Sequence, residues 1–182
     1  PTQEGLYQHF STVAKETDLP IMLYNVPSRT AVNMKPGTVA RLSSIKNIVG
    51  IKEASGSLVQ VSEIIDSCGP EFSVISGEDA LTWPILAIGG KGVISVTANL
   101  VPSKFAKLCQ TAREGDIETA KALHYELLKL NDIMFIETNP IPVKAALALM
   151  GRIENEFRLP LCPPTEENLA QLSTVLKAYS LV

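Results

Sequence analysis

The chain has 182 residues, of which 46% are hydrophobic and 19% charged, and its formal net charge is −3. With 16 Lys and Arg against 19 Asp and Glu, and no local basic cluster, the sequence lacks the positive patch that nucleic-acid binding needs. No apolar stretch reaches the roughly 18 residues of a membrane span. This composition is typical of a cytoplasmic α/β protein.

The cysteines and histidines give no metal-binding pattern. Cys68, Cys109 and Cys162 are dispersed, odd in number and without metal-ligand spacing, which indicates reduced thiols in a reducing compartment. His9 and His124, the only histidines, lie far apart in the sequence and approach no ligand cluster. We therefore expect no metal site.

Strand and helix patterns alternate through the first hundred residues. An opening helix is expected over about residues 2 to 16, with an apolar stripe formed by Leu6, Phe10, Val13 and Ala14. The expected strands are the run through Tyr24, the run from Ile48 to Lys52, Phe72–Ser76 and Gly92–Val96. Between them lie expected helices that begin near Pro36, cover about residues 57 to 67, and run through Trp83 to Ile88, where Pro84 falls late in the first turns or bends the helix.

Beyond about residue 100 the patterns are helical only. Four helices are expected, near residues 102 to 114, 117 to 135, 140 to 151 and 165 to 178. Asp116 and Thr165 are expected N-caps, and Pro140 is expected at a first helical position. The proline-rich stretch at 154 to 164 is expected to be a stiff connector.

Strands that alternate with helices of this length predict parallel pairing with right-handed crossovers. Either an open doubly wound sheet or a barrel satisfies that rule, and periodicity does not choose between them.

Lys52 is the most informative residue, because it ends the β-branched run Ile48-Val49-Gly50-Ile51. Such a run is typical of a strand buried on both faces, so the lysine that ends it is expected to be partly desolvated. Desolvation disfavours the ammonium form and leaves more free amine to attack a carbonyl. The alternative is an ordinary strand-end lysine that reaches solvent.

A second buried run ends at Tyr24, and Arg29 follows five residues later in the loop. A phenol at a strand end can relay protons, and a guanidinium can hold a carboxylate through two parallel hydrogen bonds. Taken separately, Tyr24 could be a core tyrosine and Arg29 a solvated loop charge. Their joint placement at strand ends with Lys52 favours one reactive rim.

Four segments of the chain stand out together. In chain order they are Tyr24-Asn25-Val26-Pro27-Ser28-Arg29-Thr30, Gly50-Ile51-Lys52-Glu53-Ala54-Ser55-Gly56, Gly92-Val93-Ile94-Ser95-Val96-Thr97-Ala98-Asn99 and Asn139-Pro140-Ile141-Pro142-Val143-Lys144. Through these segments the sequence resembles the dihydrodipicolinate synthase family of pyruvate-dependent class I aldolases. This resemblance implies a (β/α)8 TIM barrel followed by a C-terminal helical extension. Residues 1–114 would form the second half of the barrel and residues 115–182 the extension. The chain opens on a segment similar to the helix after the fourth barrel strand, so we expect the first four strands to lie outside it.

The resemblance also implies the chemistry. Lys52 would form a Schiff base with pyruvate, Tyr24 would relay protons and Arg29 would bind the carboxylate of L-aspartate 4-semialdehyde, in lysine and diaminopimelate biosynthesis. Ile94, through its main-chain carbonyl, and Asn139 are further expected substrate-binding residues. Gly77 is either a turn glycine or a point of close approach. No metal or organic cofactor is implied, and a homotetramer that requires the missing barrel half is expected.

Two alternatives stay open at this point. The first is a sibling aldolase of the N-acetylneuraminate or keto-deoxy-gluconate type, which shares the tyrosine and the lysine. The second is a half-barrel that serves only as a scaffold.

Overall fold

The computed structural model describes all residues from 1 to 182, which divide into two compact units, Pro1–Ile94 and Ser95–Val182. The division expected from the sequence, after residue 114, assigns the first helix of the second unit to the barrel. That architectural division remains a prediction.

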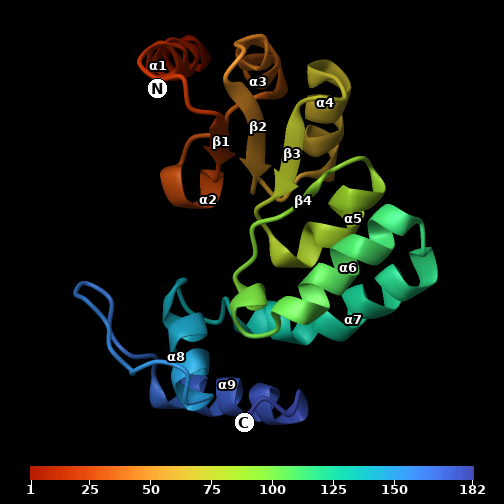
Figure 1. Ribbon diagram of the computed structural model, residues 1–182. Coiled ribbons are helices and arrows are strands. Elements are labelled where there is room, and N and C mark those ends of the chain that lie inside the picture. Colours follow the sequence, from red (N-terminus) through yellow and green to blue (C-terminus); the bar gives the residue numbers. More distant parts are fainter. The chain divides into compact units, whose positions relative to one another are not determined.

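The first unit contains a four-stranded sheet in the order β1-β2-β3-β4 (Figure 1). The strands are β1 Ile21–Asn25, β2 Ile48–Glu53, β3 Ser73–Ser76 and β4 Gly92–Val93. All three pairings are parallel, as predicted, and the register places Tyr24 beside Lys52 and Lys52 beside Ile75. The carboxyl ends of the strands therefore meet at one edge of the sheet.

One helix precedes the first strand of this unit, and the other helices connect successive strands. In chain order the helices are α1 Gln3–Lys15, α2 Pro27–Thr30, α3 Pro36–Ser43, α4 Leu58–Cys68, the 3-10 turn η1 Asp79–Leu81 and α5 Thr82–Ala87. The short helix α2 was not predicted; Pro27 supplies its first residue, and Ala31 ends it in the left-handed conformation at φ 54°. Pro84 is the third residue of α5, where the first turn needs no intrahelical donor.

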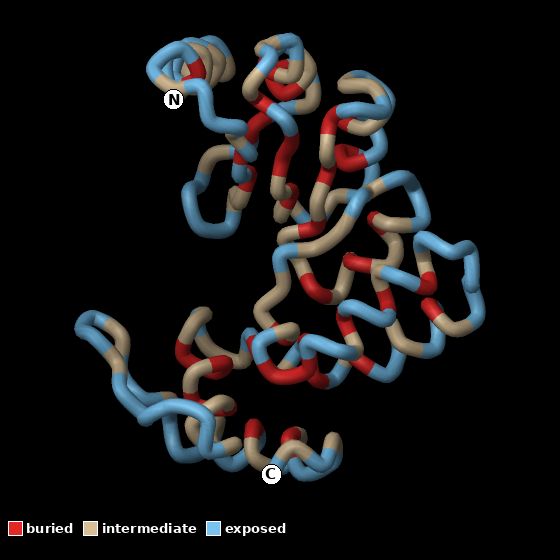
Figure 2. The backbone as a smooth tube through the Cα atoms, in the orientation of Figure 1, coloured by how far each residue is buried: buried red, intermediate tan, exposed pale blue.

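The core lies between the sheet and the helices α1, α3 and α4, which stand in a row (Figures 1 and 2). Leu23, Ile51 and Val74 point into this core and are at most 1% exposed. Burying each such side chain contributes about 1.5–3 kcal/mol. Met22 and Tyr24, on the opposite face of β1, are 37% and 47% exposed. The expectation of strands buried on both faces is therefore wrong for β1, because helices cover only one face of this sheet.

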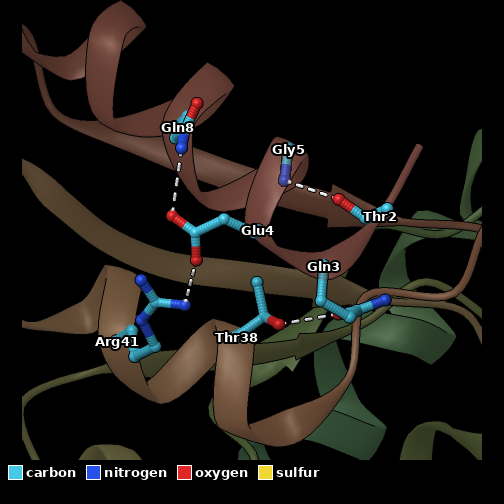
Figure 3. Close-up of polar contacts among 7 residues, drawn as sticks. All are labelled: Thr2, Gln3, Glu4, Gly5, Gln8, Thr38 and Arg41. Carbon is cyan, nitrogen blue, oxygen red and sulfur yellow. Dashed lines mark hydrogen bonds and ion pairs between the residues drawn. The ribbon is translucent and has the colours of Figure 1, made fainter.

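Polar contacts hold α1 against α3 (Figure 3). Glu4 accepts hydrogen bonds from Gln8 at 3.2 Å and Arg41 at 2.8 Å, and the Thr38 hydroxyl donates to Gln3 at 2.6 Å. Of the predicted apolar stripe of α1, Leu6 and Phe10 pack on the core and Ala14 is buried. Val13 is 41% exposed, so its inclusion in the stripe was wrong.

The fourth strand is shorter than predicted. It ends at Val93 instead of Val96, because the chain turns into the 3-10 segment η2 Thr97–Asn99. The Ser95 hydroxyl accepts a hydrogen bond from the Ala98 amide at 2.8 Å, and Val96 has right-handed helical dihedrals. A serine that caps a turn in this way competes with continuation of the strand.

The second unit is helical, with α6 Pro102–Glu114, α7 Ile117–Ile133, α8 Ile141–Leu149 and α9 Glu166–Ala178. Asp116 and Thr165 are N-caps, as predicted; they accept hydrogen bonds from the amides of Thr119 and Asn168. Pro140 precedes the first residue of α8 and does not begin it. None of the helices has the length and apolar character needed to cross a membrane.

Candidate active site

Lys52 and Tyr24 face each other at the carboxyl ends of β2 and β1. They are register partners, and the lysine Nζ lies 4.2 Å from the centroid of the tyrosine ring. Tyr24 is 47% exposed and Lys52 is partly buried. An ammonium over an aromatic face is attracted by the ring, which restrains where the amine can point. The amine and the phenol predicted to cooperate are thus neighbours.

Gly77 lies directly against the Lys52 side chain. A Cβ atom at position 77 would come within 3.0 Å of Lys52 Cε, 3.1 Å of Lys52 Cγ and 2.8 Å of Ala54 Cβ. The Gly77 amide donates a hydrogen bond to the Glu53 carbonyl at 2.8 Å, which extends the β2–β3 ladder by one residue. Of the two interpretations of this glycine, the geometry favours the close approach.

Arg29 and Ile94 belong to the same unit as this pair, and each follows a strand of its sheet. Arg29 lies in the last turn of α2, four residues beyond the end of β1, and is exposed. Ile94 lies one residue beyond β4, where its amide donates to the Ser76 carbonyl at 2.9 Å. Tyr24, Lys52, Gly77, Ile94 and Arg29 therefore all follow or end strands at one edge of the sheet.

Asn139 lies in the second unit, immediately before α8. Its Oδ1 atom is buried and has no hydrogen-bond partner. This oxygen has almost no solvent-accessible surface to which a ligand could donate, so the contact of Asn139 with substrate stays a prediction. The structure thus gathers five of the six predicted site residues within one unit and places Asn139 in the other.

Glu53 was missed by the sequence reasoning, although it follows Lys52 directly. Its side chain is 1% exposed and accepts hydrogen bonds from the Ser55 amide at 2.6 Å, from Asn25 at 3.0 and 3.2 Å, and from Gln60 at 3.2 Å. Successive strand residues point to opposite faces, so Glu53 lies on the helix side while Lys52 lies on the open side. An acidic residue at the end of an apolar strand was the available signal.

Glu78 is a second missed acid, in the segment Gly77-Glu78-Asp79 after β3. Burial, and to a smaller extent the neighbouring Asp79 carboxylate, raise the pKa of the Glu78 carboxyl above its ordinary value. A carboxyl group shifted in this direction is better suited to hold a proton than an ordinary surface glutamate. No group of three or more His, Cys, Asp or Glu side chains could hold a metal ion.

An amine beside a phenol at parallel strand ends is an arrangement suited to carbonyl chemistry. The model of the dihydrodipicolinate synthetase family matches residues 1–179. The chain belongs to this family. A 4-hydroxy-tetrahydrodipicolinate synthase of Nitratidesulfovibrio vulgaris strain DP4 is 54% identical over 183 residues, an alignment that covers 100% of this chain and 63% of the relative.

Solved structures give the same family and the fold. The crystal structure of dihydrodipicolinate synthase from Aquifex aeolicus superposes with a TM-score of 0.97 at 49% identity, covering 100% of this chain and 62% of that one. The chloride-inhibited dihydrodipicolinate synthase from Acinetobacter baumannii, described as complexed with pyruvate, gives a TM-score of 0.97 at 43% identity, with 100% and 62% coverage.

Within the dihydrodipicolinate synthetase family, the four parallel strands match half of a TIM barrel, and C-terminal helices follow them. The prediction of a half-barrel with helices is confirmed, and the choice between open sheet and barrel is settled in favour of the barrel. The chain spans about 63% of the length of the curated relatives that it matches.

Proposed function

We propose that this chain carries the Schiff-base half of a 4-hydroxy-tetrahydrodipicolinate synthase, which condenses pyruvate with L-aspartate 4-semialdehyde. The observation that carries the proposal is the position of Lys52: its amine lies 4.2 Å from the Tyr24 ring centroid, and its side-chain carbons pack against Gly77. The family membership and the names of the relatives support it. A sibling aldolase is less well supported, because the relatives aligned over the whole chain are named as synthases.

In the proposed mechanism the neutral Lys52 amine attacks the keto carbon of pyruvate, and loss of water gives an imine. The imine withdraws electrons, so a methyl proton leaves and an enamine forms. The enamine carbon then attacks the aldehyde carbon of the semialdehyde, which makes the new carbon–carbon bond and, with a proton, turns the aldehyde oxygen into a hydroxyl. The amino group of the semialdehyde then attacks the imine carbon and displaces the Lys52 amine, which frees the enzyme. Tyr24, as the neighbouring phenol, would carry protons to and from the oxygen atoms during these steps.

The remaining residues act in binding. Arg29 would hold the carboxylate of the semialdehyde through paired hydrogen bonds, and the Ile94 carbonyl would lie beside the lysine. Asn139 is a further proposed substrate-binding residue. Division into a half-barrel at 1–114 and an extension at 115–182, a homotetramer and a place in cytoplasmic lysine biosynthesis belong to the same proposal.

The test requires the rest of the barrel. We define the completed protein as this chain joined to the part of the Nitratidesulfovibrio vulgaris relative that lies outside the 63% match. Pyruvate is added, followed by borohydride, which reduces an imine to a stable secondary amine. Peptide mass spectrometry should locate the added mass on Lys52, and Lys52→Ala should abolish both labelling and condensation.

Lys144, in the segment that follows Asn139, is the internal control. Labelling of Lys144 with Lys52 unmodified would overturn the assignment. Labelling of Lys52 together with turnover of a different aldehyde would replace the synthase with a sibling aldolase.

A further inference from the structure

The buried Glu53 carboxylate has no cationic partner. Its hydrogen bonds come from three neutral donor groups, the Asn25 and Gln60 side-chain amides and the Ser55 main-chain amide. An ionised carboxylate accepts hydrogen bonds and donates none, so it matches an environment made only of donors. Such charge-assisted hydrogen bonds are shorter and stronger than neutral ones. The site is therefore built for a glutamate, not for its amide.

Asn25 connects the Glu53 carboxylate to the loop that contains Arg29. Its Oδ1 accepts a hydrogen bond from the Met34 amide at 2.9 Å, and its Nδ2 donates to Asn33 Oδ1 at 2.8 Å. The loop of residues 26–33 thus leaves β1 at Asn25 and returns to the side chain of the same residue. Arg29 lies in the middle of a loop whose two ends are tied together.

Gln60 closes the network from α4. Its Nε2 donates to Glu53 Oε2 at 3.2 Å and to Asn33 Oδ1 at 3.1 Å, and its Oε1 accepts from Asn33 Nδ2 at 2.9 Å. One connected set of side chains, Asn25, Asn33, Glu53 and Gln60, therefore links the ends of β1 and β2, the Arg29 loop and α4. We refer to this set as the strand-end network.

Glu53 also reaches the reactive lysine through the main chain. It is the residue after Lys52, and its carbonyl accepts the hydrogen bond of Gly77, the residue packed against the lysine side chain. A shift of the Glu53 backbone would therefore move Lys52 and Gly77 together. The Glu53 side chain thus holds the Arg29 loop through Asn25 and Gln60, and the Glu53 main chain holds Gly77 beside Lys52.

We propose that Glu53 is a positioning residue that holds the Lys52 strand end and the Arg29 loop in a fixed relation through the strand-end network. The inference rests on the proposed function, because it assigns a role in placing the enamine against the carboxylate-bound semialdehyde. Misplacing reacting groups by about 1 Å can cost on the order of 10²-fold in rate. A network that fixes both groups therefore contributes to catalysis without contacting substrate.

The test compares Glu53→Gln with Glu63→Gln in the completed protein. Glu63 is exposed on α4 and controls for the loss of one negative charge. In Glu53→Gln the new side-chain NH2 group would face the donors of Asn25, Ser55 and Gln60 and could not accept their hydrogen bonds. The contacts that tie down the Arg29 loop should therefore weaken. We expect the KM for the semialdehyde to rise about tenfold and kcat to fall about tenfold, with borohydride labelling of Lys52 retained. Glu63→Gln should leave all three unchanged.

Asn33→Ala is a second variant that leaves the buried carboxylate intact. Asn33 is exposed, so its truncation spares the core while it disconnects the loop from Asn25 and Gln60. We expect a higher KM for the semialdehyde, an unchanged KM for pyruvate and little change in melting temperature. This variant decides the question if Glu53→Gln does not fold.

A purely structural Glu53 would lower the melting temperature and leave the kinetic constants of both variants at the wild-type values, which would overturn the inference. The proposed function fails separately, if wild-type Lys52 is not labelled by pyruvate and borohydride. Partial recovery of the KM for the semialdehyde in Glu53→Gln combined with Gln60→Glu, which returns one carboxylate to the network, would support the inference.

Discussion

Lys52 and Ala54 leave no room for a side chain at position 77. A Cβ atom there would lie 3.0 Å from Lys52 Cε, and Ala54 Cβ would close the other side at 2.8 Å. The Lys52 side chain therefore occupies space that only a glycine at position 77 leaves open.

Gly77→Ala in the completed protein should force Lys52 off its position, so borohydride trapping of the pyruvate imine should slow by roughly 10- to 100-fold. Gly37→Ala is the matched control, because a Cβ at position 37 meets nothing within 4 Å and lies in helix α3. Trapping rates are compared by mass spectrometry over time. Equal rates in both alanine variants would show that the contact with Gly77 does not restrain the amine.

Tyr24→Phe separates the ring from the hydroxyl. The phenylalanine keeps the aromatic face 4.2 Å from Lys52 Nζ but cannot relay a proton. We expect kcat to fall by about 10²-fold or more while the amount of trapped imine at saturation is unchanged. Tyr24→Leu should in addition reduce trapping, because it removes the aromatic face. A Tyr24→Phe variant with normal kcat would assign the tyrosine a packing role only.

Arg29→Ala should raise the KM for the semialdehyde far more than the KM for pyruvate. The lost carboxylate contact is expected to cost about 2 to 4 kcal/mol in kcat/KM. Arg29→Lys should recover only part of this, because an ammonium cannot make the two parallel hydrogen bonds of a guanidinium. The exposed Arg152→Ala is the control for loss of a positive charge. Equal effects on both substrates would identify Arg29 as structural.

The hydrogen bonds of Glu137 should make the stability of the second unit sensitive to acid. Glu137 Oε1 accepts hydrogen bonds from Asn168 Nδ2 at 2.7 Å and from the Thr165 amide at 2.9 Å, and these hold the pKa of the Glu137 carboxyl below its ordinary value. A lowered folded-state pKa stabilises the fold above the unfolded-state pKa, about 4.3 for glutamate, and this contribution is lost as the pH falls below it.

The melting temperature of the completed protein should therefore drop between pH 6 and pH 3.5, and Glu137→Gln should drop less over the same range. Glu154→Gln, at an exposed position of the connector, is the control and should follow the wild type. Parallel curves for wild type and Glu137→Gln would mean that the contact with α9 contributes no stability.

The 182-residue chain alone should self-associate and lack synthase activity. In this sheet β1 and β4 each have one strand neighbour, and Met22 and Tyr24 on its open face are 37% and 47% exposed. Unpaired edges and exposed apolar faces favour pairing with other chains. Sedimentation and a coupled assay with both substrates test this expectation. A monodisperse, active monomer of 19.7 kDa would contradict it.

Most helices and strands could be predicted from local sequence, because the spacing of apolar residues and the N-cap residues are signals that involve only neighbouring positions. The strands that end one residue beyond Tyr24 and Lys52, and the caps Asp116 and Thr165, were predicted in this way. The fourth strand was predicted too long, because the turn set by Ser95 and Ala98 is a side-chain contact that the β-branched run does not reveal.

The sequence by itself determined that the amine of Lys52 ends one apolar run, and that the phenol of Tyr24 ends a second run, which the guanidinium of Arg29 follows in the next loop. Only the tertiary structure decided that the Lys52 side chain packs against Gly77 and that Glu53 is surrounded by donors. Those donors come from positions 25, 55 and 60, which no local pattern connects. The physical reason is that a strand alternation assigns a residue to a face, whereas the partners on that face are brought there by the packing of separate elements.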